Sequence, residues 1–178
     1  MTQHNAASAS ITNSDASPRV ANTAGIGGAS VLQYKEDFVV VPASADTTSI
    51  FRVVRVNSTA IVKDVYLESE AQTVGVVNVG VWYADSLSDL APSNAANLGL
   101  VIDEDFFASL VDIGSAVAKT DVVNESGTYT LDKRQQPLWQ AVGLTVDPGG
   151  KFDIGCKPST SVTTGLGRLG IGVKYVTP

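Results

Sequence analysis

The sequence contains very few of the residues from which catalytic and metal sites are usually built. Its 178 residues include one cysteine, Cys156, and one histidine, His4. A Ser-His-Asp triad or a Cys-His pair needs a histidine that is held in place by its neighbours, and no zinc site can be assembled from one cysteine and one histidine near the N-terminus. We therefore expect no enzyme, no catalytic residue, no metal and no cofactor. Because a lone cysteine forms no intrachain disulfide, we predict that Cys156 is a small buried apolar residue.

Charged residues are also scarce, at 17% of the chain, and 18 acidic residues face 12 basic ones, for a net charge of −6. An acidic chain without clustered Lys and Arg disfavours binding along nucleic acid phosphates. No run approaches the roughly 18 apolar residues of a membrane span, and the first residues lack the basic and apolar regions of a secretory signal. We therefore expect neither nucleic acid nor membrane as a partner, and synthesis in a reducing cytoplasm. A surface with few charges is compatible with a protein interface.

The first 30 residues differ in composition from the rest of the chain. Of these, 21 are Ala, Ser, Thr, Asn or Gly, and only Asp15 and Arg19 carry charge. Such a segment buries too little apolar surface to offset the entropy that it loses on ordering. We predict an arm over residues 1–33, disordered when alone, and one folded domain over residues 34–178. The arm either orders along a neighbouring protein or is a passive tail, and composition favours neither.

If the arm binds a neighbouring protein or subunit, its contacts must come mainly from backbone and apolar groups. Its small side chains allow close approach of the backbone, and its charges are too few for a set of salt bridges. Strand addition to a sheet edge is one way to satisfy such a segment. The candidate contact residues are Ile11, Val20, Ile26, Val31 and Tyr34.

The pattern of residues 34–178 is that of a β-rich domain. Short runs of β-branched and aromatic residues, separated by turn signals, favour an antiparallel β-sandwich. The run over residues 74–83 is apolar on both faces, as expected inside a sandwich, and Asp147-Pro148-Gly149-Gly150 predicts a turn. Strands are predicted over residues 38–41, 50–56, 61–68, 74–83, 127–131, 151–156 and 169–176.

Two short helices are predicted within this β-rich domain. The first begins at Asp103, which is suited to cap it, and the acidic residues that follow suit a helix N-terminus. Its apolar contacts are expected from Phe106, Phe107 and Leu110. The second covers residues 133–142, with Pro137 in its first turns and a glycine as its C-terminal stop.

Two local motifs have a functional and a structural interpretation. Residues 165–170 match the dinucleotide fingerprint G-x-G-x-x-G, but that motif must open a helix and be followed by a distant acidic residue. Here only eight residues remain, and they predict a strand. The cluster Asp103-Glu104-Asp105 lacks the spacing of a calcium loop, so helix capping explains it better. A carboxylate pair for glycoside hydrolysis stays open, although Trp82 and Trp139 lie in apolar surroundings rather than in loops.

The order of several segments resembles a family of known proteins. The segments are Phe51-Arg52-Val53, Val79-Gly80-Val81-Trp82-Tyr83, Val101-Ile102-Asp103-Glu104-Asp105-Phe106-Phe107-Ala108-Ser109, Pro137-Leu138-Trp139-Gln140-Ala141-Val142-Gly143-Leu144 and Asp147-Pro148-Gly149-Gly150-Lys151-Phe152-Asp153-Ile154. Together they resemble the decoration, or cement, proteins of tailed-bacteriophage capsids. The resemblance spans roughly residues 50–176, and it rests on order and spacing rather than on one diagnostic motif. The arm lies outside it.

The resemblance implies a mainly β fold, a jelly-roll-like sandwich with one or two short helices, assembled as a homotrimer on the outer capsid surface of the virion. Such proteins bridge neighbouring major capsid subunits, stabilise the head and have no catalytic residues. Two alternatives remain at this point. One is another virion component, such as a tail, head-completion or host-adhesion protein, and the other is a carbohydrate-binding β-sandwich.

Overall fold

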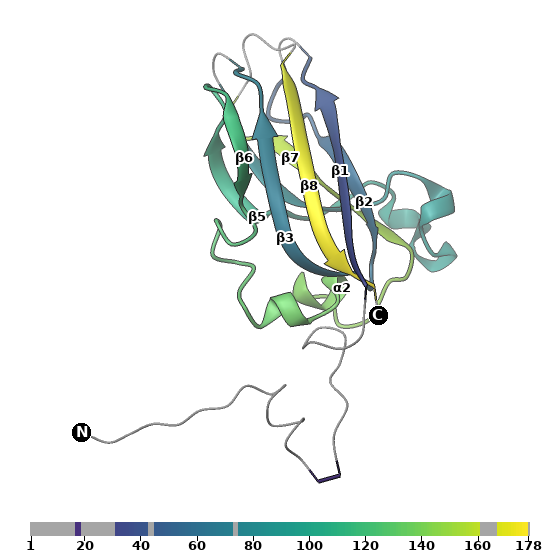
Figure 1. Ribbon diagram of the computed structural model, residues 1–178. Coiled ribbons are helices and arrows are strands. Elements are labelled where there is room, and N and C mark those ends of the chain that lie inside the picture. The colour runs from purple at the N-terminus through teal and green to yellow at the C-terminus, as the bar shows by residue number, and fades with distance from the viewer. Residues whose placement is uncertain (1–16, 19–30, 43–44, 73–74, 161–166, 178) are drawn as a thin grey trace, which may run out of the picture.

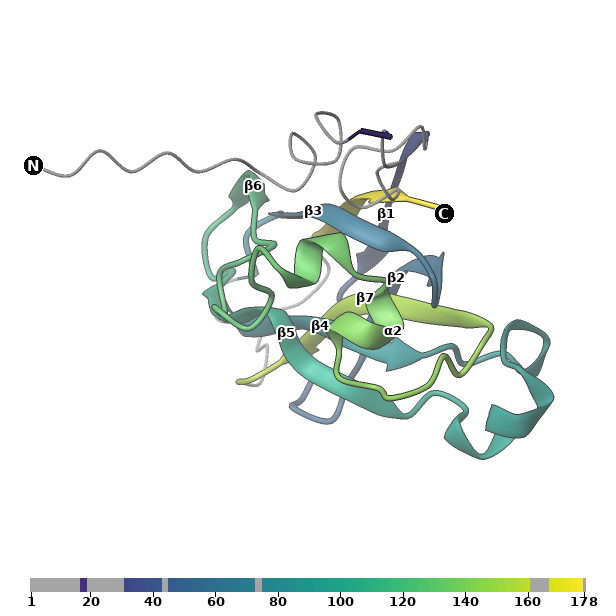
Figure 2. The same ribbon diagram turned by 90° about the horizontal axis from the view of Figure 1, so that it is seen from below.

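The chain folds into two β-sheets that lie face to face. The structure is a computed structural model that describes residues 17–18, 31–42, 45–72, 75–160 and 167–177. Within these residues there are eight strands in two four-stranded antiparallel sheets, seen as two layers in Figures 1 and 2. The strands are β1 (Leu32–Val40), β2 (Phe51–Asn57), β3 (Ile61–Ser69), β4 (Val76–Tyr83), β5 (Val101–Asp112), β6 (Val117–Asp121), β7 (Lys151–Pro158) and β8 (Arg168–Val176).

The strand order is that of a jelly roll. Sheet A has the order β1-β8-β3-β6, and sheet B has the order β2-β7-β4-β5. The first strand therefore pairs with the last, the second with the seventh, the third with the sixth and the fourth with the fifth, all antiparallel. This is the pattern of a long hairpin rolled into a two-layer sandwich. The prediction of a mainly β, jelly-roll-like sandwich is confirmed.

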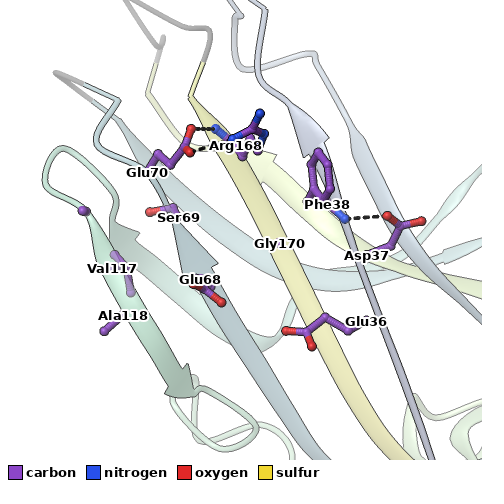
Figure 3. A pocket seen from close by; sticks show the side chains of 11 residues that line it. Glu36, Asp37, Phe38, Glu68, Ser69, Glu70, Val117, Ala118, Arg168 and Gly170 are labelled. Carbon is purple, nitrogen blue, oxygen red and sulfur yellow. Dashed lines mark hydrogen bonds and ion pairs between the residues drawn. The ribbon is translucent and has the colours of Figure 1, made fainter.

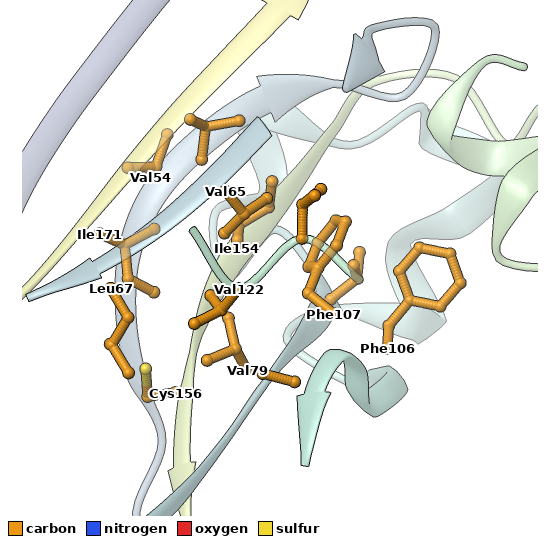
Figure 4. Packing of buried hydrophobic residues seen from close by; sticks show 14 of the residues in the cluster. Val54, Val65, Leu67, Val79, Phe106, Phe107, Val122, Ile154, Cys156 and Ile171 are labelled. Atoms are coloured by element: carbon orange, nitrogen blue, oxygen red, sulfur yellow. The ribbon is translucent and has the colours of Figure 1, made fainter. Parts of the chain in front are cut away.

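The hydrophobic core fills the space between the two sheets. Figure 4 shows Leu67 and Ile171 of sheet A facing Val79, Ile154 and Cys156 of sheet B. All five side chains are fully buried. Because β4 is buried on both faces along most of its length, its nearly continuous apolar run has the pattern that was predicted for an interior strand.

The segment that was predicted to be a helix from Asp103 is a strand instead. β5 is the longest strand, and its pairing with β4 shifts register three times. Leu110 adopts a positive φ of 58° near its end, and Phe106, Phe107 and Ala108 are buried in succession. Such irregularities place neighbouring side chains on one side of a strand and remove the period-two pattern. The acidic residues therefore cap no helix.

The second predicted helix is present in broken form. A 3-10 turn, η4 (Lys133–Gln135), is followed by the one-turn helix α2 (Leu138–Ala141), and Pro137 lies between them as the N-cap of α2. Gly143 has a positive φ of 90° just past the end of α2, as expected for a stop. The backbone amide of Leu138 donates to the carbonyl of Ala60 at 2.8 Å. This contact holds the helix against the β2–β3 turn at the lower end of the sandwich in Figure 1.

The strand predicted over residues 127–131 is absent. The backbone there is bent and irregular, and Tyr129 is fully buried in contact with the rings of Phe106 and Phe107, whose centroids lie 5.1 Å from its own. Its hydroxyl donates to the carbonyl of Val62 at 2.7 Å. The segment is held by this one anchored side chain rather than by a ladder of backbone hydrogen bonds.

Residues 147–150 bend the chain into β7, where a turn was predicted: Asp147 Oδ1 accepts from the amide of Gly149 at 2.8 Å, Gly149 and Gly150 have positive φ, and β7 starts at Lys151. β1 begins at Leu32, two residues before the start proposed for the domain. Of the arm, only residues 17–18 and 31–33 are among those that the structure describes.

Candidate functional site

The residue types that carry chemistry do not come together in the described part of the chain. Cys156 lies in the core, and burial raises the pKa of its thiol, so it is a core residue as predicted. His4 lies outside the described residues. Across the described ranges, no three His, Cys, Asp or Glu side chains group closely enough to hold a metal ion. None of the helices found in those ranges has the length and apolarity to cross a bilayer.

The acidic cluster of β5 is held by structural contacts. Glu104 forms an ion pair with Lys157 of β7. Burial, together with a hydrogen bond to Asp105, raises the pKa of the Asp103 carboxyl. Asp105 in turn donates its backbone amide to Asp103 Oδ1 at 3.3 Å. These contacts lie within the edge strand β5 and between it and β7, two strands away in sheet B, and they do not form a pair of carboxylates across a cleft.

The end of the glycine motif of residues 165–170 lies in strand β8, as predicted, and not at the start of the helix that a dinucleotide site needs. Gly170 and Gly172 lie on β8, opposite Phe38 and Glu36 of β1. Their positions on the outer face of sheet A leave a flat strip along β8, since neither has a side chain. The ring of Tyr34 occupies part of this strip, because a Cβ atom on Gly172 would overlap its hydroxyl group.

The outer face of sheet A carries a row of exposed apolar side chains along the edge strand β1. Paired residues of adjacent antiparallel strands project to the same side, so the alternate residues of β1 share the face of Gly170 and Gly172. Phe38 is 55% exposed and Tyr34 is 44% exposed. The exposed apolar residues on β1 and just before it are Val31, Leu32, Tyr34, Phe38 and Val40.

One lysine connects the two edges of sheet A across its outer face. Lys119 of β6 donates from Nζ to the hydroxyl of Tyr34 and to Glu36 Oε1, the latter at 2.9 Å. Its ammonium also lies 4.8 Å from the centroid of the Tyr34 ring and 5.5 Å from that of Tyr66 on β3. The hydrogen bonds to Tyr34 and Glu36 raise the pKa of Lys119, and its ammonium in turn lowers the pKa of Glu36. This cluster covers the middle of the face.

A groove of about 680 Å³ lies beside this cluster, toward the end of β1 (Figure 3). Its floor is Gly170 and the adjoining part of β3, and its two walls are Phe38 on one edge strand and residues 116–118 at the other edge. The side chains that form the wall on the β6 side are small, and Ala118 among them is exposed. The groove is therefore shallow, apolar along its walls and accessible to an extended polypeptide.

Most of the charges around the groove are already paired. Glu36 is bonded to Lys119, and Arg168 Nη1 lies 3.1 Å from Glu70 Oε1 with its guanidinium 5.5 Å from the Phe38 ring centroid. Asp37 contributes its backbone to the groove, because it pairs with the inward-facing Ile171 and its carboxylate projects to the other side of β1. One further carboxylate, that of Glu68, lines the groove, and among the described residues it has no cation within ion-pair distance. The groove thus presents uncompensated negative charge.

The outer face of sheet B has a different character, because its charges hold a loop in place. The loop over residues 84–100 contains the 3-10 turns η2 (Leu87–Asp89) and η3 (Pro92–Asn97) and projects to the side of the sandwich in Figures 1 and 2. Arg52 of β2 donates to the carbonyl of Gly99 at 2.8 Å, and Arg55 Nη1 donates to Asp89 Oδ2 at 2.7 Å. The loop also carries exposed apolar side chains: Leu87, Leu98 and Leu100.

Two of the five predicted contact residues are among those that the structure describes. Ile11, Val20 and Ile26 lie outside the described residues. Val31 and Tyr34 are exposed, the first just before β1 and the second within it. Sequence reasoning predicted a strand over residues 38–41 but did not identify Phe38 and Val40 as exposed contact residues. The alternation of Tyr34, Glu36 and Phe38 with Gln33, Lys35 and Asp37 was the available signal of a two-sided edge strand.

Comparisons with known proteins identify the fold. No family model and no curated protein sequence matches the chain. Among solved structures, it matches a chain of the capsid of Ralstonia phage GP4 with a TM-score of 0.50 and 11% identity, over 90% of this chain and 92% of that chain. At this identity the likeness establishes a shared fold.

Two further solved structures match at lower TM-scores. One is a chain of the cyanophage Pam1 capsid asymmetric unit, with a TM-score of 0.43 and 15% identity over 92% of this chain and 97% of that chain. The other is from the acidic stable capsid of Helicobacter pylori bacteriophage KHP30, with a TM-score of 0.36 and 11% identity over 83% and 89%.

Proposed function

We propose that this protein is a structural component of a phage virion, a decoration protein that binds the outer surface of the capsid, bridges neighbouring major capsid subunits and stabilises the head. The observation that carries the proposal is the row of exposed apolar residues on β1, from Leu32 to Val40, at the edge of a rigid jelly roll. The fold shared with a chain of the Ralstonia phage GP4 capsid supports it. The protein acts as a homotrimer and has no enzymatic activity.

The physical argument begins with the edge strand. A free edge offers unpaired amides and carbonyls as a template for another chain, and natural proteins usually protect it with charges or short strands. β1 has nine residues, is exposed on both faces over most of its length and carries Tyr34 and Phe38 on one face. An exposed apolar surface of this kind marks a site of protein–protein contact.

The rest of the molecule suits a cement function because it is held rigidly. The two arginines of β2 bind the projecting loop over residues 84–100 to the face of sheet B. A rigid element loses less conformational entropy on association than a flexible one. The β1 row and the exposed leucines of this loop, on opposite sheets, give the molecule two surfaces with which to contact two neighbours.

The N-terminal arm provides a further contact, and the protein resides on the outside of the virion. Residues 1–33 order on the capsid or on a neighbouring subunit, with Ile11, Val20, Ile26, Val31 and Tyr34 as contacts. The chain is made in the bacterial cytoplasm and resides on the virion, and its net charge of −6 disfavours a position against packaged nucleic acid.

Binding to purified heads tests the function directly. Particles that lack the protein are mixed with the purified chain, sedimented, and imaged by cryo-electron microscopy. We expect density on the outer capsid surface between major capsid subunits, and heads that release their genome at a higher temperature. Density at a tail or neck would instead identify a tail or head-completion protein. Failure to bind particles, together with binding to a glycan array, would favour the carbohydrate-binding alternative.

A matched pair of variants tests the role of the β1 row. Phe38→Asp places a charge in the row, and we expect at least a ten-fold loss of affinity for heads. Leu131→Asp places the same charge at a residue that is also exposed but lies in the turn region after residue 127, and it should bind like the wild type. Equal binding by both variants would remove β1 from the contact.

A further inference from the structure

We propose that the groove on the outer face of sheet A binds the segment around Arg19 and Val20 of a second copy of this chain. The proposal assigns a receiving site to the arm and concerns contacts between copies, so it holds or fails in solution without any capsid.

The groove has the shape for a slender polypeptide. Its floor is a glycine, Gly170, and the nearest atom to a Cβ built there is the Asp37 carbonyl oxygen at 3.5 Å, so no side chain covers β8 at this position. One wall is the exposed ring of Phe38, and the other includes Ala118. A bulky helix would not enter between these walls, whereas an extended chain with mostly small side chains would.

The groove also has a charge preference. Glu68 faces it from β3 at the position paired with Gly170, and Figure 3 shows the Glu68 side chain beside β8, between Glu36 and the Glu70–Arg168 ion pair. With Glu36 and Glu70 already paired, Glu68 is the carboxylate of the groove that remains to be compensated. The complementary ligand is an extended segment with one cation and a neighbouring apolar side chain.

The arm contains one segment with these properties. Arg19 is the only Lys or Arg among residues 1–31, and it is followed directly by Val20. The flanking residues are small, with Ala16 and Ser17 before and Ala21 and Asn22 after, apart from Pro18. Val20 would pack on the ring of Phe38 while the guanidinium of Arg19 reaches Glu68, a charge-assisted contact of the kind that fixes register as well as affinity.

The direction of β1 favours a second copy over the chain's own arm. β1 runs from Leu32, near the C-terminus at the lower end of Figure 1, toward the groove at the upper end. The arm therefore joins the sheet at the end opposite the groove. To enter its own groove it would have to reverse and cross the cluster of Tyr34 and Lys119, which already covers the middle of the face.

The length of the arm is sufficient for the contact between copies. Twelve residue steps separate Arg19 from Val31, which corresponds to a reach of about 40 Å when extended. An arm that inserts into the groove of the next copy forms a head-to-tail contact, and such contacts close into a ring when the rotation allows. Each added contact in a ring is intramolecular and gains from effective concentration.

Disulfide trapping between two variants distinguishes a contact between two copies of the chain from a contact within one copy. Val20→Cys in one preparation and Ala118→Cys in a second, size-tagged preparation are mixed under mild oxidation, so that any mixed disulfide joins two chains. The native Cys156 is buried and stays unreactive. We expect the mixed species to exceed, at least ten-fold, that formed by Val20→Cys with Leu87→Cys, an exposed position on the projecting loop. Equal trapping at both positions would overturn the proposal, and so would a disulfide that forms only within a chain carrying both Val20→Cys and Ala118→Cys.

Charge exchange tests the pairing itself. Arg19→Glu should lower the trapped fraction about ten-fold, Glu68→Arg should do the same, and the two changes together should restore it. Glu68 is exposed, so an unchanged melting temperature is expected for the Glu68→Arg variant and separates loss of binding from loss of fold. If both single variants trap as efficiently as the parent pair, Arg19 does not bind Glu68 and the proposal fails.

Discussion

Arg55 of β2 and Asp153 of β7 form a two-point ion pair on the face of sheet B, with Nε 2.5 Å from Oδ1 and Nη2 2.8 Å from Oδ2. The Asp153 side chain is only 2% exposed, whereas that of Arg55 is 29% exposed. The hydrogen bonds to Asp153 raise the pKa of the Arg55 guanidinium above its already high ordinary value, so this group keeps its positive charge. A second arginine, Arg52, approaches Asp153 at 3.5 Å.

Removal of Arg55 should destabilise the fold strongly. In Arg55→Met, Asp153 would remain buried with only the longer contact to Arg52, and an uncompensated buried charge costs about 3 to 5 kcal/mol. We expect a loss of about 3 kcal/mol in the free energy of unfolding, measured by urea denaturation. Arg168→Ala is the control, because its partner is Glu70 and both side chains are more than half exposed. It should cost less than about 1 kcal/mol, and equal losses in the two variants would contradict the account.

Stability should fall in acid because of the carboxylates that hold the projecting loop. The hydrogen bond from Arg55 lowers the pKa of Asp85, and hydrogen bonds from Lys151 and Arg55 lower that of Asp89. A carboxyl group whose pKa is lowered by folding stabilises the folded state at any pH above the ordinary aspartate pKa of 3.8. This contribution is lost as the pH falls through the lower pKa that the group has in the folded protein.

Urea midpoints across pH measure this effect. The midpoint should be steady near neutrality and decline below about pH 4 to 5. The double variant Asp85→Asn with Asp89→Asn should be less stable at neutral pH and show a shallower decline. A decline as steep as that of the parent would assign the acid sensitivity to other carboxylates, such as Glu36, whose pKa is also lowered, first by its hydrogen bond with Lys119.

Cys156 should be chemically silent in the folded protein. Its side chain is fully buried between the sheets, and burial raises the pKa of the thiol, so that the reactive thiolate is rare. We expect no reaction with a thiol-specific dye in native buffer and full reaction in concentrated guanidinium. A Cys placed at the exposed Ala118 serves as the positive control. Rapid labelling of the native wild type would mean that the sandwich opens at β7.

Two glycines, one in each sheet, should respond differently to replacement by alanine. A Cβ on Gly155 of β7 would overlap the carbonyl oxygen of Phe51 and lie 3.1 Å from the Cα of Arg52, so the backbone of β2 would have to move. We expect Gly155→Ala to cost about 3 kcal/mol, measured by denaturation. Gly170→Ala has ordinary contacts and should be neutral or slightly stabilising, since glycine weakens a strand by about 0.5 to 1 kcal/mol. Similar losses in both would show that β2 can shift.

Deletion of residues 1–30 should separate folding from retention on the capsid. β1 starts at Leu32, so the truncated chain keeps all eight described strands, and we expect a nearly unchanged melting temperature. Retention on heads during heating should weaken, because the arm adds a long contact in each subunit. A truncated chain that binds heads as tightly as the full chain would make the arm a passive tail. A truncated chain that unfolds would place the arm in the core.

The short range of the signals explains which predictions of structure succeeded. The all-apolar run that became β4 and the alternation that became β8 each identify a strand within about ten residues, and Asp147-Pro148-Gly149-Gly150 identifies its turn within four. The helix predicted from Asp103 failed because acidic residues followed by Phe106 and Phe107 have the local pattern of a helix start. The bulged pairing with β4, which makes this segment a strand, is not visible within it.

The sequence by itself determined the β class, the absence of a paired cysteine and the composition of the arm, because these depend on residue type and short-range periodicity. The tertiary structure alone decided the clusters on its faces. Arg55 and Asp153 are 98 residues apart, and Lys119 and Glu36 are 83 residues apart. The groove is likewise formed by β1, β3, β6 and β8 together with the residues just before β6. Such neighbours are set by the order of strands in the rolled hairpin, and that order follows from the packing of the whole chain rather than from any local pattern.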